Sequence, residues 1–154
     1  MRVREATPAD VPTLMAIERH AITAAHWGES DYARIFSSGP PRRVALVIEE
    51  TAICGFLVAR VLGDEWELEN IAVAGPARRR GLGASLLGHF LDLARRQGAV
   101  SVFLEVRESN RAARQLYEKW AFCESGRRKS YYRNPLEDAV VYRFSFSPPA
   151  PKNR

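Results

Sequence analysis

Residues 78–84 of this 154-residue chain combine three consecutive arginines with two closely spaced glycines. Glycines let the backbone turn tightly and approach a ligand closely, and N–H groups at the start of a helix point toward an anion. The helix dipole adds a partial positive charge of roughly +0.5 there, and arginine side chains offer paired donors to phosphate oxygens. We therefore predict a pyrophosphate-binding turn formed by Arg78, Arg79, Arg80, Gly81, Leu82, Gly83 and Ala84.

Two better-known phosphate-binding loops do not fit this segment. A Walker loop has Lys-Ser or Lys-Thr directly after its last glycine, whereas this chain has Ala84-Ser85. The dinucleotide-binding fingerprint has a third glycine at the position of Leu86. An ordinary glycine-rich turn with a basic surface is the simpler alternative.

The hydrophobic pattern predicts a strand before this turn and a helix after it. Residues 66–73 alternate and then become apolar throughout, which is typical of a strand that enters a core. After the turn, apolar residues recur at helical spacing until Gly98, a residue type that commonly ends helices. They are Leu82, Leu86, Leu87, Phe90, Leu91 and Ala94.

The other elements predict an α/β fold with a mixed sheet. Residues 44–48 and 53–62 should form an antiparallel meander with residues 66–73. Further strands are expected at 3–6, 100–106, Phe122 and 139–146, and further helices from Thr7, over 31–36 and over 110–120. This order gives a mostly antiparallel sheet of about seven strands flanked by about four helices. We expect one domain over residues 1–146, with the proline-rich residues 147–154 outside the fold.

Composition excludes several classes of protein. With 46% hydrophobic and 27% charged residues, the chain is too apolar to be wholly disordered. No apolar run approaches the ~20 residues of a membrane-spanning helix, and no signal peptide is visible, so we expect a cytoplasmic protein. Two cysteines and three scattered histidines indicate neither a disulfide scaffold nor a metal site.

The charges are unevenly distributed along the chain. Residues 1–75 contain 7 basic and 11 acidic residues, whereas residues 76–154 contain 16 basic and 7 acidic residues. This asymmetry predicts two sites of opposite sign, one for phosphates or nucleic acid and one for a cationic partner. The alternative is charge that is merely solvated at the surface.

The predicted turn resembles the acyl-CoA signature of the GNAT superfamily of N-acetyltransferases, Arg/Gln-x-x-Gly-x-Gly/Ala, through Arg78, Gly81 and Gly83. A narrower resemblance, to the ribosomal-protein-alanine N-acetyltransferases, comes from four motifs. They are Leu-Glu-Val-Arg-x-Ser-Asn at 104–110, Leu-Tyr at 116–117, Tyr-Tyr at 131–132 and Glu-Asp-Ala at 137–139. The similarity covers residues 1–146 and implies the GNAT fold, with acetyl transfer from acetyl-CoA to a protein N-terminal α-amine.

The resemblance also implies roles for individual residues. The main chain of Ile71, Ala72 and Val73 would bind the acetyl group and the pantetheine arm. Asn110 would contact the CoA arm, and the residues of the predicted turn would hold the pyrophosphate. Glu105 matches the general base of the family, and Tyr117 matches its general acid and a CoA contact.

The chemistry of amine acetylation gives Glu105 a task that its sequence position suits. An α-amino group has a pKa near 8, so a carboxylate must take its proton before it attacks. Glu105 interrupts an apolar strand, although it could instead face solvent or pair with Arg107 or another arginine. Tyr117 could equally be a core aromatic residue. Glu69, which precedes Ile71 on its strand, is the alternative base.

The N-terminal half should shape the acceptor site. Trp27 lies where relatives usually carry Pro-Trp-Ser/Thr, but His26 and Gly28 flank it here, so the loop departs from the family pattern at the position expected to bind the acceptor. Tyr131 and Tyr132 could wall the other side, or be plain strand aromatics. An acidic surface for a cationic acceptor is expected from Glu18, Glu29, Asp31, Glu65, Glu67 and Glu69.

Four hypotheses of function follow. The first is N-terminal acetylation of a protein such as a basic ribosomal protein, with acetyl-CoA as donor and no direct contact with nucleic acid or membrane. The second, within the same superfamily, is acetylation of a small amine or a lysine side chain. The basic half with its aromatic residues would also suit a nucleic-acid-binding module. The last is a catalytically inactive CoA-binding regulator.

Overall fold

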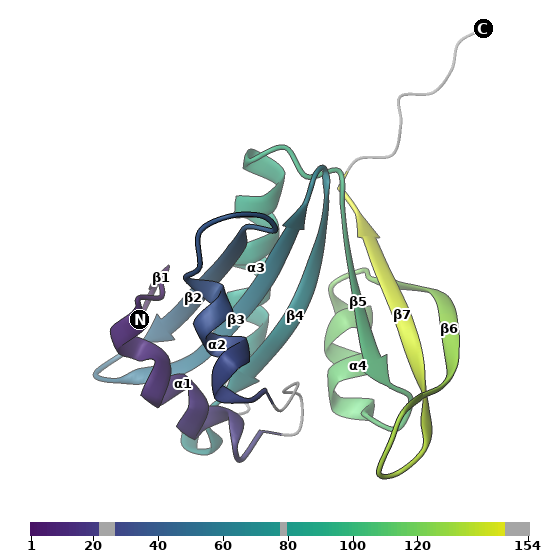
Figure 1. The fold of residues 1–154 in the computed structure, drawn as a ribbon, viewed down its shortest axis with the longest axis horizontal. Helices are drawn as coiled ribbons and strands as arrows, with labels where there is room; N and C mark the ends of the chain where they lie inside the picture. The colour runs from purple at the N-terminus through teal and green to yellow at the C-terminus, as the bar shows by residue number, and fades with distance from the viewer. Residues whose placement is uncertain (22–26, 78–79, 147–154) are drawn as a thin grey trace, which may run out of the picture.

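A computed structural model describes residues 1–21, 27–77 and 80–146 of the chain. The strands form one seven-stranded sheet in the order β1-β2-β3-β4-β5-β7-β6 (Figure 1). The strands are β1 (Arg2–Glu5), β2 (Arg43–Glu49), β3 (Ile53–Leu62), β4 (Glu65–Val73), β5 (Ser101–Arg107), β6 (Cys123–Tyr132) and β7 (Glu137–Ser145). The α-helices are α1 (Val11–Glu18), α2 (Glu29–Ile35), α3 (Leu82–Arg96) and α4 (Arg111–Lys119), with short 3-10 turns at Pro8–Asp10 and Gly75–Ala77. The predicted mixed sheet and its class of fold are confirmed.

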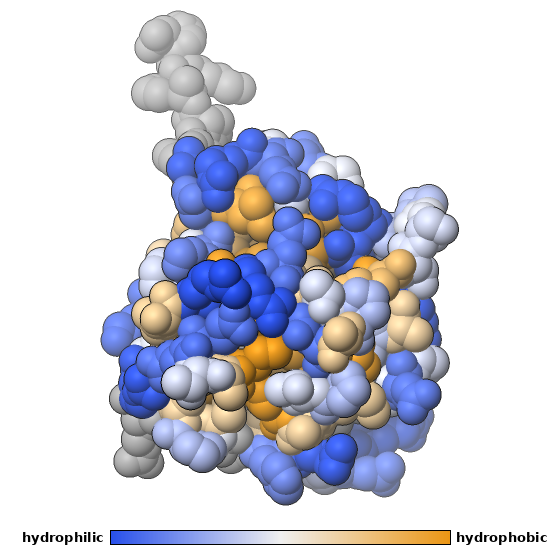
Figure 2. Space-filling view, turned by 90° about the vertical axis from the view of Figure 1, so that its left-hand side faces the viewer, coloured by the Kyte–Doolittle hydropathy of each residue, from blue (hydrophilic) through white to orange (hydrophobic). Residues whose placement is uncertain are grey.

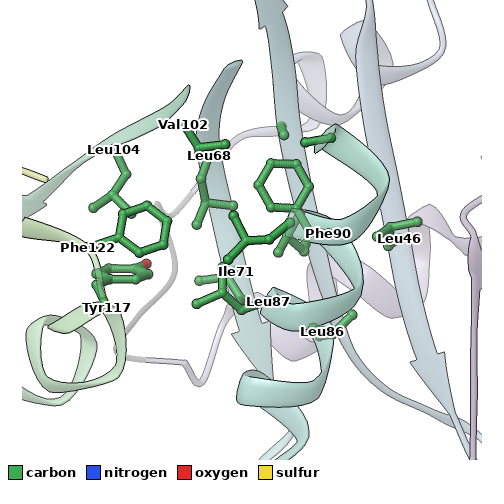
Figure 3. Packing of buried hydrophobic residues seen from close by; sticks show 14 of the residues in the cluster. Leu46, Leu68, Ile71, Leu86, Leu87, Phe90, Val102, Leu104, Tyr117 and Phe122 are labelled. Carbon is green, nitrogen blue, oxygen red and sulfur yellow. The ribbon is translucent and has the colours of Figure 1, made fainter. Parts of the chain in front are cut away.

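Two hydrophobic clusters lie on opposite faces of the sheet. The larger one joins α3 and α4 to inward side chains of β2, β3, β4, β5 and β7, and Figure 3 shows Leu87 and Phe90 of α3 packed beside Leu68 and Ile71 of β4. The smaller one joins α1 and α2 to the other face of β2, β3 and β4. Helices therefore cover both faces of the N-terminal half of the sheet, because side chains of a strand alternate between its two faces.

Helix α3 follows the predicted hydrophobic pattern closely. Its buried residues are the six that the helical spacing selects: Leu82, Leu86, Leu87, Phe90, Leu91 and Ala94. The helix ends at Arg96, and Gly98 adopts a left-handed φ of 98° just beyond it. The prediction that Gly98 ends this helix is confirmed.

Strand β6 differs from its prediction. Phe122 is buried but lies before the strand, which runs over Cys123–Tyr132. Nine of the ten residues in β6 are exposed, so the strand has no alternating pattern that periodicity could detect. It is defined instead by its antiparallel pairing with β7.

Strands β4 and β5 pair only briefly. They run parallel, and their register covers three pairs, from Glu65 opposite Ser101 to Glu67 opposite Phe103. Beyond these pairs the two strands diverge (Figure 1), while β5 continues to pair with β7. We call the diverging part, residues 68–73 of β4 and 104–107 of β5, the fork. The sheet is therefore split at its centre, where the sequence places most of the expected site residues.

A bulge lies in β4 at the beginning of the fork. Asn70 pairs with Val58 of β3, but Leu68 pairs with the next β3 residue, Ala59, so Glu69 is the extra residue. A bulge of this kind bends the strand and changes the direction of its side chains. It brings Glu69 and Asn70 to the face that carries α1 and α2, and returns Ile71 to the face of α3.

The surface at the β1 edge of the sheet is mainly hydrophilic. Figure 2 shows this side, with an apolar strip between charged side chains. Within the described ranges, no helix is long and apolar enough to cross a membrane.

Candidate active site

The N-terminus of α3 has the geometry of an anion-binding turn. Gly81 is the N-cap and has a left-handed φ of 76°, which favours glycine, and no side chain in the described ranges caps this end. The first intrahelical bond runs from the N–H of Ser85 to the carbonyl of Gly81 at 3.0 Å. The amides of Leu82, Gly83 and Ala84 precede it, and such first-turn amides have no partner within the helix. These residues fit a bound pyrophosphate.

Glycine at position 83 is not required by the packing of the protein. A Cβ atom there would make ordinary contacts with Val73 and Leu116, at 3.7 and 3.8 Å.

Arg80 is anchored beside the turn, because its guanidinium donates to both oxygens of Glu50, at 2.9 and 2.6 Å. The expected contributions of Arg78 and Arg79 lie outside the described residues.

The fork brings together the carboxylates that the sequence offers as bases. Glu105 is only 14% exposed and pairs with Arg128 of β6, Nε to Oε2 at 2.6 Å. Glu69 accepts two hydrogen bonds from Arg43, at 2.8 and 3.3 Å. The arginines differ in their freedom: the Arg128 side chain is 60% exposed, whereas that of Arg43 is 12% exposed. Arg128 can therefore move away from Glu105 more easily than Arg43 can move away from Glu69.

Glu67 is a third carboxylate at the base of the fork. Burial raises its pKa above the ordinary glutamate value, and the nearby charges of Glu69 and Glu105 raise it further, against a hydrogen bond from Arg60. The sequence predicts Glu67 only as part of the acidic surface for a cationic acceptor, not as a base. Its position two residues before Glu69, on a strand that faces Glu105, was the available signal.

Tyr117 is part of the larger hydrophobic cluster, as the simpler interpretation of its sequence position holds. Its ring packs against Phe122 and Tyr142, at centroid distances of 5.8 and 6.2 Å. Figure 3 shows its hydroxyl directed from α4 toward Ile71 of β4. Burial raises the pKa of this hydroxyl well above the ordinary tyrosine value, so it stays protonated at neutral pH. A buried core position and a proton-donating role are compatible here.

Tyr117 and Glu105 face the fork from opposite sides of the sheet. Leu104 of β5 packs in the same cluster as Tyr117, and the next residue, Glu105, points to the other face because strand side chains alternate. A bond-forming centre placed in the fork would thus have a carboxylate on one side and a phenol on the other.

The residues expected to hold the donor lie along the same part of β4. Ile71 and Ala72 are buried and pair with Leu57 and Phe56 of β3, and Val73 ends the strand. Asn110 is the N-cap of α4, where its side chain accepts from the N–H of Ala113 at 3.1 Å. The fold therefore places Ile71, Ala72 and Val73 in the fork, and fixes Asn110 at the start of the helix that carries Tyr117.

Tyr131 and Tyr132 lie at the end of β6, beside Glu105. The charge of Glu105 raises the pKa of the Tyr131 hydroxyl, and burial followed by the same charge raises that of Tyr132 to about 12. Arg128 lies over the ring of Tyr131 at 5.3 Å, and Arg107 over that of Tyr132 at 4.5 Å. The two tyrosines thus border Glu105 on the face opposite α3.

Trp27 lies on the same face as these tyrosines. Its ring packs edge-on against Tyr32 of α2, at a centroid distance of 5.4 Å, and its backbone N–H donates to Glu18 at 2.8 Å. Its neighbour His26 lies outside the described residues. Trp27 therefore belongs to the rim of the smaller hydrophobic cluster.

The expected acidic surface is corrected by the structure. Glu18 is buried and accepts hydrogen bonds inside the protein, so it does not contribute to a surface. Several others are paired with arginines brought in by neighbouring elements: Asp31 with Arg34, Glu65 with Arg143, Glu67 with Arg60, and Glu69 with Arg43. Charge alone therefore gives a weaker attraction for a cationic acceptor than the sequence suggested.

Comparison with known proteins agrees with this geometry. Residues 12–122 match the family described as the Acetyltransferase (GNAT) family, and the chain belongs to it. Enzymes of this class move an acetyl group from acetyl-CoA to an amine. The fork, the α3 N-terminus and the carboxylate of Glu105 are therefore the candidate parts of its acetyltransferase site.

The curated relatives narrow the comparison. The chain is 37% identical over 135 residues to the [ribosomal protein bS18]-alanine N-acetyltransferase of Salmonella typhimurium, covering 86% of this chain and 88% of the relative. It is 35% identical over 134 residues to the protein of that name from Escherichia coli K12, with the same coverage. The crystal structure of the Escherichia coli ribosomal-protein-S18-alanine N-acetyltransferase superposes with a TM-score of 0.82, at 31% identity and 99% coverage of both chains.

Proposed function

We propose that this enzyme acetylates the N-terminal α-amine of a protein that begins with alanine, and that a ribosomal protein of the bS18 type is its acceptor. Two relatives that carry this activity in their names are 37% and 35% identical to this chain, each over 86% of its length. The observation that carries the proposal is the position of Glu105. Its carboxylate lies at the fork, paired with the exposed side chain of Arg128 and beside Tyr131. A ribosomal acceptor would place the enzyme in the cytoplasm.

The donor fits one side of the fork. The pyrophosphate of acetyl-CoA would lie on the first-turn amides of α3, and its pantetheine arm would run along residues 71–73 toward the centre of the sheet. The acceptor would enter from the opposite face of the sheet, between the tyrosines of β6 and Trp27. We call this face, which carries α1 and α2, the acceptor face. Donor and acceptor would then meet in the fork, which holds them in line for a direct transfer.

Glu105 acts as the base in this arrangement. It takes a proton from the α-ammonium, directly or through a water molecule, and the neutral nitrogen attacks the thioester carbonyl. A C–N bond forms, and the C–S bond breaks with the electron pair going to sulfur. The attacking nitrogen gives up its second proton to water, and water returns a proton to Tyr117 after that residue has protonated the sulfur. Arg128 must leave Glu105 for the amine to approach, and its exposed position allows this movement. Glu69 stays paired with Arg43 and supports the site electrostatically.

Tyr117 supplies the proton that the departing thiolate needs. Its hydroxyl points toward the fork from α4, and its raised pKa keeps it protonated over the working range of pH. Protonation lets the sulfur leave the tetrahedral intermediate as the neutral thiol of CoA, which completes the transfer.

Replacement of Tyr117 by Phe is expected to lower kcat about 30-fold, less than the roughly 100-fold or more typical of a general acid, because a thiolate is a good leaving group even without a proton. The Michaelis constants should change little, because the ring keeps its packing against Phe122 and Tyr142. Since the pKa of Tyr117 is raised, kcat of the wild-type enzyme should stay flat up to about pH 10, the ordinary pKa of tyrosine. The rate of CoA thiol release, measured at steady state across pH, gives the kinetic constants of the variant and the pH profile of the wild-type enzyme. A wild-type kcat that falls with an apparent pKa of about 8, in a step that Tyr117→Phe removes, would contradict this assignment.

The acceptor is tested by mass spectrometry of a peptide panel incubated with enzyme and acetyl-CoA. The panel holds one basic sequence that begins with Ala, Ser, Thr or Met, the Ala peptide with a blocked N-terminus and a free lysine, and a set of small amines. Acetylation of the α-amine of the Ala peptide is the expected result. Acetylation only of lysine or of a small amine would keep the acetyltransferase chemistry and reject the proposed acceptor.

A further inference from the structure

Glu18, at the end of α1, is a buried carboxylate that the acetyl transfer does not use. It is 3% exposed. A buried carboxylate is costly unless its oxygens are well satisfied. In the described part of the chain, no arginine or lysine pairs with it, so neutral donors must offset that cost. A carboxylate kept in such a place points to a task that depends on its donors.

Three donors from three different segments converge on Glu18. The hydroxyl of Tyr32 in α2 donates to Oε1. The backbone N–H of Trp27 and the side-chain amide of Asn70 in β4 donate to Oε2, at 2.8 and 2.9 Å. Burial and the hydrogen bond to Glu18 raise the pKa of the Tyr32 hydroxyl, so it remains a donor at neutral pH. One side chain thus joins α1, the segment before α2, and β4.

Both ends of this connection belong to the candidate active site. Asn70 lies at the β4 bulge, directly between Glu69 and the donor-binding Ile71. Trp27 lies on the acceptor face and packs against Tyr32. Glu18 therefore holds the acceptor segment at a fixed place relative to the strand that carries the donor.

The charge of Glu18 suits this task. A charged acceptor makes stronger hydrogen bonds than a neutral one, and two of its three donors share a single oxygen. A glutamine in its place would have only one acceptor oxygen and would present an NH₂ group to the remaining donors. At least one of the donors would then be left unsatisfied in a buried position.

We propose that Glu18 is a positioning residue that couples the acceptor segment at Trp27 to the donor strand at Asn70. This inference rests on the proposed function only in assigning Trp27 to the acceptor face. The mechanism predicts that loss of the carboxylate loosens Trp27 and impairs acceptor binding, while the donor site at α3 is unaffected.

The test is Glu18→Gln, assayed with whichever amine the wild-type enzyme acetylates in the panel above, so that a different acceptor does not affect it. The KM for the acceptor should rise about tenfold, with the Kd for acetyl-CoA changed by less than about twofold. Ile17→Val is the matched control: Ile17 is the neighbouring residue in the same cluster, and its truncation should destabilise the protein without changing the acceptor KM. Assays are run well below the melting temperature of every variant.

A double-mutant cycle separates positioning from general destabilisation. Trp27→Ala should raise the acceptor KM in the wild-type background and have little further effect in the Glu18→Gln background. If Glu18→Gln does not fold, Tyr32→Phe removes one of the three donors and should raise the acceptor KM by about threefold. An unchanged acceptor KM in Glu18→Gln or Tyr32→Phe, or fully additive effects with Trp27→Ala, would overturn the proposal.

Discussion

Replacement of Glu105 by Gln is expected to lower kcat/KM for the amine acceptor about 100-fold, the contribution typical of a positioned general base. The amide keeps the shape of the side chain and can still accept from Arg128, but it cannot take a proton from the acceptor. The Kd for acetyl-CoA should stay within about twofold of wild type, because Glu105 lies on the face of the sheet opposite α3. Steady-state kinetics with isothermal titration calorimetry measures both quantities.

The matched control is Glu69→Gln, which removes the alternative base from the same fork. This change weakens the pair with Arg43 and should reduce stability, yet we expect kcat/KM to fall less than about tenfold. A larger loss in Glu69→Gln than in Glu105→Gln would transfer the base to β4. Equal losses would indicate that the two carboxylates act together on one proton.

The fold was predictable where one local pattern decided it. The helical spacing after Gly81 predicts the six buried residues of α3, and the apolar run of residues 100–106 predicts a strand interrupted by Glu105, which the structure places on the face opposite Leu104. These features depend on the period of a single element. Strand β6 has no such period, because it lies at the edge of the sheet with both faces largely exposed.

The electrostatics of the site could not be predicted from the sequence, because the partners are distant along the chain. Glu105 finds Arg128 on an edge strand, and Glu69 finds Arg43 on β2. Glu18 was counted among surface acids, since a single acidic residue at the end of an amphipathic helix is ordinarily solvated. Only the packing of α1 against β4 shows that it meets Asn70 inside the protein.

Replacement of Ala84 by Glu is expected to weaken acetyl-CoA binding about 100-fold without destabilising the protein. A carboxylate in the first turn of α3 would stand beside the expected pyrophosphate, and two like charges about 5 Å apart repel by about 3 kcal/mol at an effective dielectric of about 20. In the free protein the same charge meets the positive end of the helix dipole, which favours it by about 0.5 kcal/mol. Room for the side chain exists, because Ala84 borders an open depression with Gly81, Ser85, Gly88 and Trp120.

Opposite effects on stability and on binding make this variant diagnostic. A mutation that damaged the fold would lower both the melting temperature and the affinity for acetyl-CoA. Ala84→Glu should instead raise the melting temperature slightly and lower the affinity. Ala84→Gln has the same size without the charge and should weaken binding by no more than about threefold, and added salt should narrow the gap between the two variants. Titration of acetyl-CoA and of CoA into each variant gives the comparison. If the two substitutions weaken binding equally, the loss is steric, and the phosphates do not lie on the first turn of α3.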